Sequence, residues 1–557
     1  MSMKMMGMGK GDLLKKGGSG HDSVKSFRAI AERHVEETFE RFPTYGSAVG
    51  RREFNGELDK PDEKTYAAHE KSLRRTLAAV QALPENEFIR DDWLDRRAFI
   101  SELRTELWSV ERAIHRRNPD MWASGALDSI HRLVVRHADD LSPVADAILS
   151  RLKKMPDYLE RAASLLKAPV PLWQKLALKS CKGAPALFDA IAVPLAKTGK
   201  ATNPQILRLV TGAKAAFTTY AKKVENIEPG QPNDFAVGKE RFEALIRERL
   251  GWDLTVEEAE AMGKSMAQRL EVELTKEAKR FSPTKKPREI LEHAASNWKP
   301  GRGDLLSEYQ YQTFRVRDAF KRADLVTFPR DETLAVKPVP DFLRHHFPTA
   351  AYSSPGCYDR EQLGIFWVND LSLTRESPAE KQSELGQHYG LQATCAHEAY
   401  PGHHLQFCTA NRHPSKLRRL FAHAIFYEGW TLWCEKMTVD FNIVQEPTAK
   451  LNQLHDALWR AHRILIDCGL QTGRMTYEDA VRHLMKNVGF TRSRAEGDVN
   501  WYTSSPTVPM SYLLGRTELL RVMNKKVNEQ GWSIKQFNDW ILSFGTLPWR
   551  WMELSGL

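Results

Sequence analysis

The segment from Ala396 to Gln406 reads Ala-His-Glu-Ala-Tyr-Pro-Gly-His-His-Leu-Gln and places three histidines close to one glutamate. A histidine followed directly by a glutamate opens the motif of many zinc hydrolases, in which the histidine binds the metal and the glutamate polarises water. In this chain His397 and Glu398 form that pair. The second histidine of the motif usually stands four residues after the first, but Pro401 occupies this position. The segment therefore predicts a displaced zinc-hydrolase motif.

Geometry decides whether a later histidine can replace the missing ligand. Seven residues along an unbroken helix lead back to nearly the same face but about 10.5 Å along the axis, which two imidazoles around one ion could only just span. Pro401 and Gly402 disfavour an unbroken helix, because proline removes a backbone donor and glycine tolerates an irregular turn. A break there would bring His403 or His404 closer to His397, and the sequence leaves this choice open. The alternative interpretation is a core helix with hydrogen-bonded histidines.

A zinc site with two histidines needs a third protein ligand, which leaves a fourth position for water. Glu428 and Glu435 stand seven residues apart in the aromatic segment 426–435, so they share one face of a predicted helix. Because a glutamate in such surroundings is rarely buried without a partner, we predict that Glu428 binds the metal and that Glu435 accepts a hydrogen bond from a ligand imidazole. Either acid could instead pair with an arginine such as Arg460 or Arg463.

The pattern His-Glu-x-x-Pro-Gly-His-His-x-Gln, followed by Glu-Gly-Trp-x-Leu-x-x-Glu, resembles the bacterial domain-of-unknown-function 885 family. The resemblance covers most of the chain from about Phe27 onward. This family is grouped with zincin-type metallopeptidases and is thought to be largely helical, so the resemblance implies a zincin-like fold and a metallopeptidase-like activity. By resemblance to helical zinc peptidases, Tyr512 or Tyr502 would donate its hydroxyl to a tetrahedral oxyanion. The alternative for each is a half-buried structural tyrosine.

Most of the chain has the periodicity of amphipathic helices. Helices are predicted at about 23–42, 63–82, 88–117, 142–167, 203–226 and 255–281. Strand-like segments at 334–339, 349–352 and 364–369 predict a small sheet just before the motif. An edge strand beside a metal can bind an extended peptide, so Asn369 is a candidate substrate contact or, alternatively, a turn residue. Together with the resemblance, these patterns predict a mainly α, large bilobed helical zincin-like fold with a small β-sheet preceding the metal-binding helix.

The composition excludes several classes of protein. The chain has 557 residues, of which 42% are hydrophobic and 27% charged, as in soluble globular proteins. The net charge is +10, but acids are interleaved with the basic residues and no nucleic-acid-binding motif is present, so we expect no nucleic-acid partner. No run of 18 apolar residues occurs, so we expect no membrane span. We predict a disordered tail at 1–22 and one helical metallohydrolase-like domain at 23–557, with a cleft between about 23–300 and 301–557.

The six cysteines form no Cys-x-x-Cys pair, and the first residues contain no apolar export signal. We therefore predict reduced thiols and a cytoplasmic location.

These observations predict a zinc-dependent hydrolase of peptide or other amide bonds, with one zinc ion and Glu398 as the general base. The substrate would be a peptide or a small amide. Two alternatives stay open, a non-hydrolytic metalloenzyme such as an iron-dependent oxidase, and a non-catalytic binding protein on the same helical scaffold. The sequence leaves open the substrate, the choice between endo- and exopeptidase action, and the oligomeric state.

Overall fold

The computed structural model of the chain describes residues 20–137, 139–339, 344, 349–444 and 446–556. The protein is mainly helical, with a small sheet before the histidine-containing segment, as the sequence predicts. Of the tail predicted at 1–22, residues 1–19 lie outside the described residues. The first helix begins at Gly20 and so includes the last three residues of the predicted tail.

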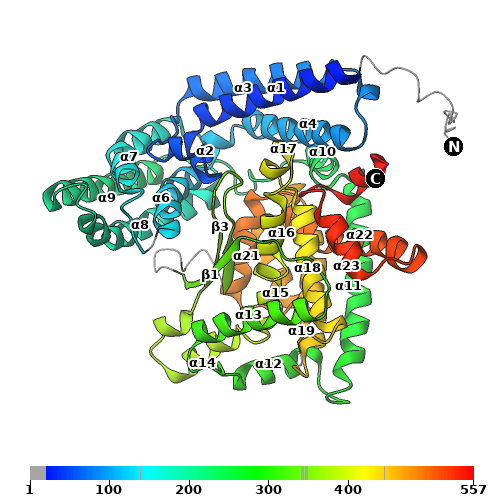
Figure 1. Ribbon diagram of the computed structural model, residues 1–557. Helices are drawn as coiled ribbons and strands as arrows, with labels where there is room; N and C mark the ends of the chain where they lie inside the picture. The colour runs from blue at the N-terminus through cyan, green and yellow to red at the C-terminus, as the bar shows by residue number, and fades with distance from the viewer. Residues whose placement is uncertain (1–19, 138, 340–343, 345–348, 445, 557) are drawn as a thin grey trace.

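Helices α1 to α9 form the N-terminal part of the molecule and lie along the top and the left of Figure 1. In these helices a buried residue recurs every three or four positions, so that one face is turned to the core. In α3 the buried positions include His69, Leu73, Thr76 and Val80. Four of the predicted helices, α1, α3, α7 and α9, are confirmed. The bounds are α1 Gly20–Arg41, α2 Pro43–Ala48, α3 Glu63–Gln81, α4 Arg90–Glu111, α5 Ile114–Arg117, α6 Pro119–Arg136, α7 Ala145–Leu165, α8 Pro171–Lys197 and α9 Asn203–Glu225.

This part differs from the expectation in several places, since α2, α6 and α8 lie outside the predicted ranges. The helix predicted over 88–117 is interrupted, because Ala113 adopts a left-handed backbone with φ of 51° and separates α4 from α5. Helix α8 is not expected from the sequence, since Pro185 and Pro194 lie inside it and each proline removes a backbone donor. Its buried apolar face, which includes Phe188 at 0% exposure, packs into the core of α6 to α9 and stabilises the helix against that loss.

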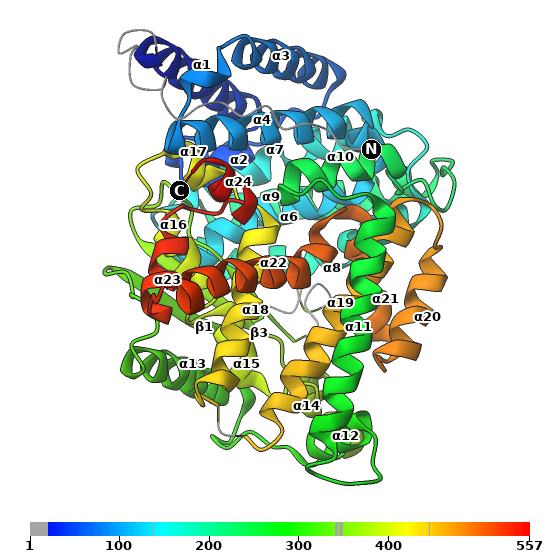
Figure 2. The same ribbon diagram turned by 90° about the vertical axis from the view of Figure 1, so that its right-hand side faces the viewer.

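Helices α10 to α24 form the rest of the helical structure. The capping box of Thr255 and Glu258 starts α11 as predicted, and Figure 2 shows this long helix beside α19. The bounds are α10 Lys239–Leu250, α11 Val256–Ala278, α12 Pro287–Asn297, α13 Leu305–Arg322, α14 Pro378–Gly386, α15 Leu391–Glu398, α16 His403–Ala410, α17 Lys416–Leu420, α18 Ala424–Asp440, α19 Ala449–Gln471, α20 Tyr477–Asn487, α21 Arg492–Ser504, α22 Val508–Met523, α23 Ile534–Leu542 and α24 Trp549–Leu554.

Hydrophobic cores join distant parts of the chain. Leu94 and Ala98 of α4 share one core with Trp430 and Trp433 of α18. A second core joins α10 and α11 to α18, α19 and α22. The helices before residue 300 therefore pack directly on those after it. The cleft between 23–300 and 301–557 stays a prediction.

The sheet contains β1 Glu332–Pro338, β2 Ala350–Ser353 and β3 Gln362–Val368, in the order β1-β3-β2. Strand β3 lies in the middle, parallel to β1 and antiparallel to β2. Its residues from Gly364 to Val368 are all buried, which explains the continuous apolar run in the sequence. Strands β1 and β2 are the edges, and β2 carries Tyr352 toward the histidine-containing segment, as described below.

Helices α18 and α22 approach each other at two glycines. A Cβ atom added to Gly429 would lie 2.6 Å from the carbonyl carbon of Gly515, and one added to Gly515 would lie 2.2 Å from the carbonyl oxygen of Ile425. Neither position has room for a side chain, because the opposing atoms are backbone. The two backbones are therefore in direct contact, and this contact sets the distance between α18 and α22.

We expect Gly429→Ala to lower the stability of the protein by about 1–3 kcal/mol, because the added methyl group pushes the two helices apart. The matched control is Gly212→Ala in α9, where an added Cβ meets nothing within 4 Å. There, alanine should stabilise the helix by about 0.5–1 kcal/mol. The midpoints of thermal unfolding of both variants test this expectation. A midpoint for Gly429→Ala equal to that of the wild type would contradict it.

Candidate metal centre

The histidine-containing segment is broken where the sequence predicts a break. Helix α15 ends at Glu398 and α16 begins at His403. Only glycine fits at position 402, because an added Cβ would lie 1.8 Å from the carbonyl oxygen of His397. The indole nitrogen of Trp430 donates a hydrogen bond of 2.9 Å to the carbonyl oxygen of Pro401 and so fixes the break against α18.

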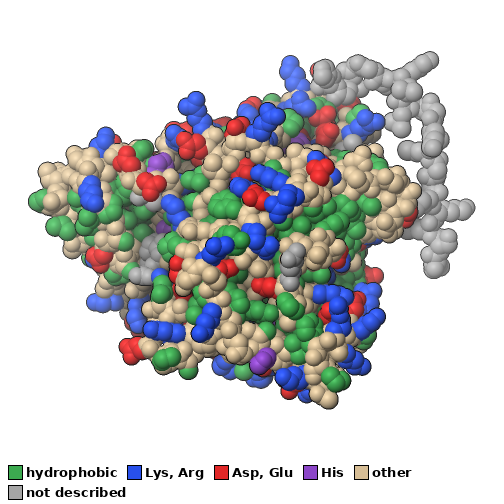
Figure 3. Space-filling model, turned by 60° about the horizontal axis from the view of Figure 1, so that its bottom comes forward, with side chains coloured by type: hydrophobic (Ala, Val, Ile, Leu, Met, Phe, Trp, Pro, Cys, Tyr) green, Lys and Arg blue, Asp and Glu red, His purple; other side chains and the backbone are tan. Residues whose placement is uncertain are grey.

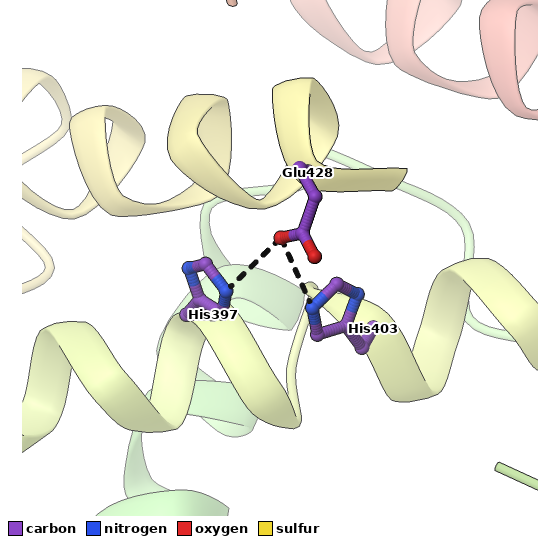
Figure 4. Close-up of side chains that lie close together, drawn as sticks. All are labelled: His397, His403 and Glu428. Carbon is purple, nitrogen blue, oxygen red and sulfur yellow. Dashed lines mark ion pairs between the residues drawn. The ribbon is translucent and has the colours of Figure 1, made fainter. Parts of the chain in front are cut away.

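The break brings two histidines to one glutamate, as Figure 4 shows. His397 comes from the end of α15, His403 from the start of α16, and Glu428 from α18. The Nε2 atoms of His397 and His403 lie 3.6 and 3.5 Å from Oε2 of Glu428. The three potential ligand atoms all lie within 4.8 Å of one another, and all three residues are buried. Side chains from three helices thus surround one point.

The donor set fits a zinc ion. Oε2 of Glu428 is buried and has no hydrogen-bond partner among the described residues. A buried carboxylate oxygen without a hydrogen bond is costly, and a cation between the three ligands would reduce that cost. Two imidazole nitrogens and one carboxylate oxygen are a common protein ligand set for zinc, with one position left open.

The carboxylates around His397 strongly favour its charged form. Burial alone would lower the pKa of His397, but Glu428 and Glu435 outweigh this effect and raise the pKa to about 10. Burial opposes ionisation of Glu428 as well, yet His403 and His397 hold the pKa of that carboxyl well below its usual range. Without a metal ion, a proton therefore neutralises part of the cluster. Binding of a metal ion would release that proton.

Glu435 lies behind His397 and orients its ring. Oε1 of Glu435 is 2.8 Å from Nδ1 of His397, which leaves Nε2 directed at the centre of the cluster. The guanidinium of Arg460 donates a hydrogen bond of 3.4 Å to the same oxygen. Both sequence-based interpretations of Glu435, a partner for a ligand imidazole and a partner for an arginine, therefore describe contacts that the structure contains.

We expect Glu435→Gln to weaken zinc binding by about 10–100-fold, as losses of such orienting carboxylates typically do. Glutamine keeps the shape of the side chain but removes the charge that favours the orientation of His397. The control is Asp440→Asn on the same helix, where the carboxylate pairs with Lys436 at 2.9 Å. Competition with a chromogenic chelator measures the affinity of both variants. Equal affinities of the two variants would show that Glu435 does not support the metal.

Glu398 is the acid with a free carboxylate beside the cluster. No hydrogen bond or ion pair joins it to another described residue. Burial raises its pKa, while the nearby His397 and His403 lower it and Glu428 raises it further. Glu398 is thus a carboxylate within electrostatic reach of the three ligands that forms no hydrogen bond or ion pair with them.

The chain is similar to a known protein family over most of its length. A family of bacterial proteins of unknown function, DUF885, matches residues 43–554. The chain belongs to the DUF885 family. The resemblance seen in the sequence is therefore confirmed at the level of the family, over almost the whole chain. A comparison with curated proteins gave no match.

Two solved structures share the fold of this DUF885 protein. One is a "putative lipoprotein of unknown function" from Shewanella oneidensis, with a TM-score of 0.74 and 21% identity, covering 95% of this chain and 99% of the other. The other is a "putative lipoprotein" from Colwellia psychrerythraea, with a TM-score of 0.72 and 18% identity, covering 96% of this chain and 98% of the other. At such identities the likeness shows the fold alone.

The DUF885 chain directs His404 away from the cluster. Its Nε2 lies 2.6 Å from Oε2 of Glu332, and its Nδ1 lies 2.9 Å from the hydroxyl of Tyr352. The sequence leaves open whether His403 or His404 binds the metal. In the structure, His403 lies beside Glu428, whereas His404 contacts Glu332 and Tyr352 of the sheet. The strand pattern predicted the segment that carries Tyr352, but nothing in the sequence pairs Glu332 or Tyr352 with a histidine 50 or more residues away.

Tyr512 lies at the cluster, whereas Tyr502 has other partners. The ring of Tyr512 stacks on that of His397 with centroids 6.4 Å apart, and burial and the Glu428 carboxylate raise its pKa well above the usual range. The hydroxyl of Tyr502 accepts a hydrogen bond of 2.7 Å from Nε of Arg463 and donates one of 3.2 Å to Asp498. These contacts agree with the structural interpretation of Tyr502.

Asn369, the other candidate substrate contact, is 0% exposed. Its side-chain nitrogen donates a hydrogen bond of 2.8 Å to the carbonyl oxygen of Arg344, and its backbone N–H donates to that of Thr349. This geometry agrees with the alternative interpretation of Asn369 as a turn residue.

The charges on the surface and the hydrophobicity of the helices are relevant to the predictions of no nucleic-acid partner and no membrane span. In the face shown in Figure 3, lysine and arginine side chains lie interspersed with acidic ones. No helix within the described residues is long and apolar enough to cross a membrane. The cytoplasmic location stays a prediction, and the names of the two structural neighbours, which call them lipoproteins, do not support it.

Proposed function

We propose that the protein is a zinc-dependent hydrolase of peptide or other amide bonds. The observation that supports this proposal is the convergence of His397, His403 and Glu428 beside the unpaired carboxylate of Glu398. The cluster provides three metal ligands, and Glu398 provides a separate base. A structural metal site usually has four protein ligands, whereas a catalytic one has three and keeps an open position.

Each residue has a defined task in this proposal. A zinc ion held by His397, His403 and Glu428 would lower the pKa of water toward 7 and polarise a carbonyl group. Glu398 takes the proton of the attacking water and passes it to the nitrogen of the leaving amine. Tyr512 donates its hydroxyl to the oxygen of the scissile carbonyl as negative charge develops there. Glu435 keeps the ring of His397 in place throughout.

The edge strand β2 supports a peptide as the substrate. Tyr352 of β2 stacks nearly parallel to His403, with ring centroids 6.3 Å apart. Because β3 is the one strand that pairs with β2 among the described residues, the other edge of β2 would offer backbone groups to an extended chain. This arrangement, with a sheet edge beside a His-Glu helix, is the basis on which we propose a zincin-like architecture for the protein.

Elemental analysis of full-length protein, purified without affinity-tag metal, tests the proposal together with turnover on a library of peptides and small amides. We expect one equivalent of zinc, and turnover that a chelator abolishes and zinc restores. Stoichiometric iron with an absorption band in the visible or near-ultraviolet range would favour the oxidase instead. Absence of metal, or of any metal-dependent turnover, would favour a binding protein.

A further inference from the structure

A cavity of about 490 Å³ lies between the N-terminal helices and α17, and its lining includes none of the residues of the candidate metal cluster. We call it the N-terminal cavity. It is walled by α1 to α7, and by Leu420 and Phe421 at the end of α17. Its size is that of sites for small organic molecules, which typically range from about 300 to 1,000 Å³.

The walls of the N-terminal cavity are largely aromatic. The lining includes Phe39, Phe42, Tyr45, Tyr66, Trp122 and Phe421. The face of an aromatic ring carries negative potential, so several rings around one space attract a cation as well as an apolar group.

Several polar groups of the lining already have partners. The carboxylate of Asp59 accepts hydrogen bonds from the N–H and the hydroxyl of Thr44, at 3.0 and 2.6 Å. Oε1 of Glu106 lies 2.8 Å from Nε2 of His69. These groups already form hydrogen bonds or ion pairs within the protein, so few of their donors and acceptors remain to bind a ligand.

Glu102 and His115 are two groups of the lining whose side chains lack hydrogen-bond partners among the described residues. No hydrogen bond or ion pair joins the carboxylate of Glu102 to another described residue. Burial and the nearby Glu106 raise the pKa of Glu102 to about 7, whereas Arg249 lowers it, so a cation beside it would favour its charged form. His115 is 5% exposed, and its Nε2 has no hydrogen-bond partner among the described residues. Burial lowers the pKa of His115 to about 4, so the imidazole is neutral. Its ring stacks on Tyr66 with centroids 3.9 Å apart, which fixes its orientation.

We propose that the N-terminal cavity binds an organic cation, an ammonium group on an apolar body, with Glu102 as its counter-charge and His115 as a second hydrogen-bond partner. An ammonium group supplies the donors that both side chains lack, and the aromatic walls contact the apolar body and the positive charge. The site is separate from the proposed hydrolase centre. Its ligand and its test therefore do not depend on hydrolysis.

Isothermal titration calorimetry of the full-length protein with benzylamine and with the uncharged benzyl alcohol tests this proposal. We expect benzylamine to bind at least about tenfold more tightly, because hydrogen bonds to a charged group are the stronger ones. Glu102→Gln should abolish this preference. The control is Glu111→Gln on the same helix, whose carboxylate pairs with Arg74 at 2.8 Å outside the cavity; it should keep the preference.

A variant that fills the cavity provides the second test. Gly125 of α6 lines the cavity, and an added Cβ would meet only the hydroxyl of Tyr158, at 3.9 Å. Gly125→Leu should therefore abolish binding of both probes without lowering the midpoint of thermal unfolding. Four outcomes would overturn the proposal. With the wild type, these are binding of benzyl alcohol as tight as that of benzylamine, or no binding of either probe. With the variants, they are an unchanged preference in Glu102→Gln, or full binding of benzylamine by a folded Gly125→Leu.

Discussion

Glu398→Gln is expected to keep its zinc and to lose about 10²–10⁴-fold in turnover, as is typical when a general base is removed. The loss could be larger, because the same carboxylate also carries the proton to the leaving group. Glutamine preserves the shape of the side chain but cannot accept the proton. Since Glu398 makes no hydrogen bond or ion pair with a described residue, its replacement should leave the cluster of His397, His403 and Glu428 intact.

The matched comparison is Glu428→Gln, the same substitution at the acid that would bind the metal. This variant should first lose metal, and added zinc should partly restore its activity. Metal content and turnover of both variants separate the two roles, with any amide substrate found in the library. If Glu398→Gln loses metal while Glu428→Gln retains it, the two glutamates have been assigned the wrong way round.

The second large effect is expected at the histidines. His397→Gln and His403→Gln should weaken zinc binding by more than the roughly 10–100-fold that the loss of an orienting group costs, because each removes one of three ligands. His404→Gln should retain zinc with nearly unchanged affinity. Its ring contacts Glu332 and Tyr352, and a glutamine amide can replace part of these hydrogen bonds.

Zinc affinity by chelator competition measures all three histidine variants, and circular dichroism shows whether each is folded. Because His403 and His404 are neighbours in the chain, a general effect on the helix would affect both alike. A folded His404→Gln variant without zinc, or a His403→Gln variant with full affinity, would contradict the proposed ligand set.

The sequence predicted the mainly helical fold and the small sheet because their signals are local. The capping box of Thr255 and Glu258 and the apolar periodicity of α3 are contained within the helices that they form. The interruption at Ala113 and helix α8 are not apparent in such patterns. Packing with neighbouring helices overrides the local preference there, and this packing is set by residues far away in the sequence.

The candidate site was predictable where its residues lie close together in the sequence. His397, Glu398 and the Pro-Gly break stand in one short segment, and Glu428 and Glu435 follow within one helix. The choice between His403 and His404 depends on Glu332, which reaches His404 from the sheet. No spacing rule contains that contact, because the fold alone brings the two residues together.

The contact between Gly429 and Gly515 restricts how the molecule can move. The backbones of α18 and α22 touch at these glycines, so sliding one helix past the other would cause a clash, and we expect the two helices to move together. Glu428 directly precedes Gly429, and Tyr512 lies one helical turn before Gly515, so we expect these two side chains to keep their separation. We therefore expect an opening that admits a large ligand to occur elsewhere around the cluster, such as where Tyr352 on the short edge strand β2 stacks on His403.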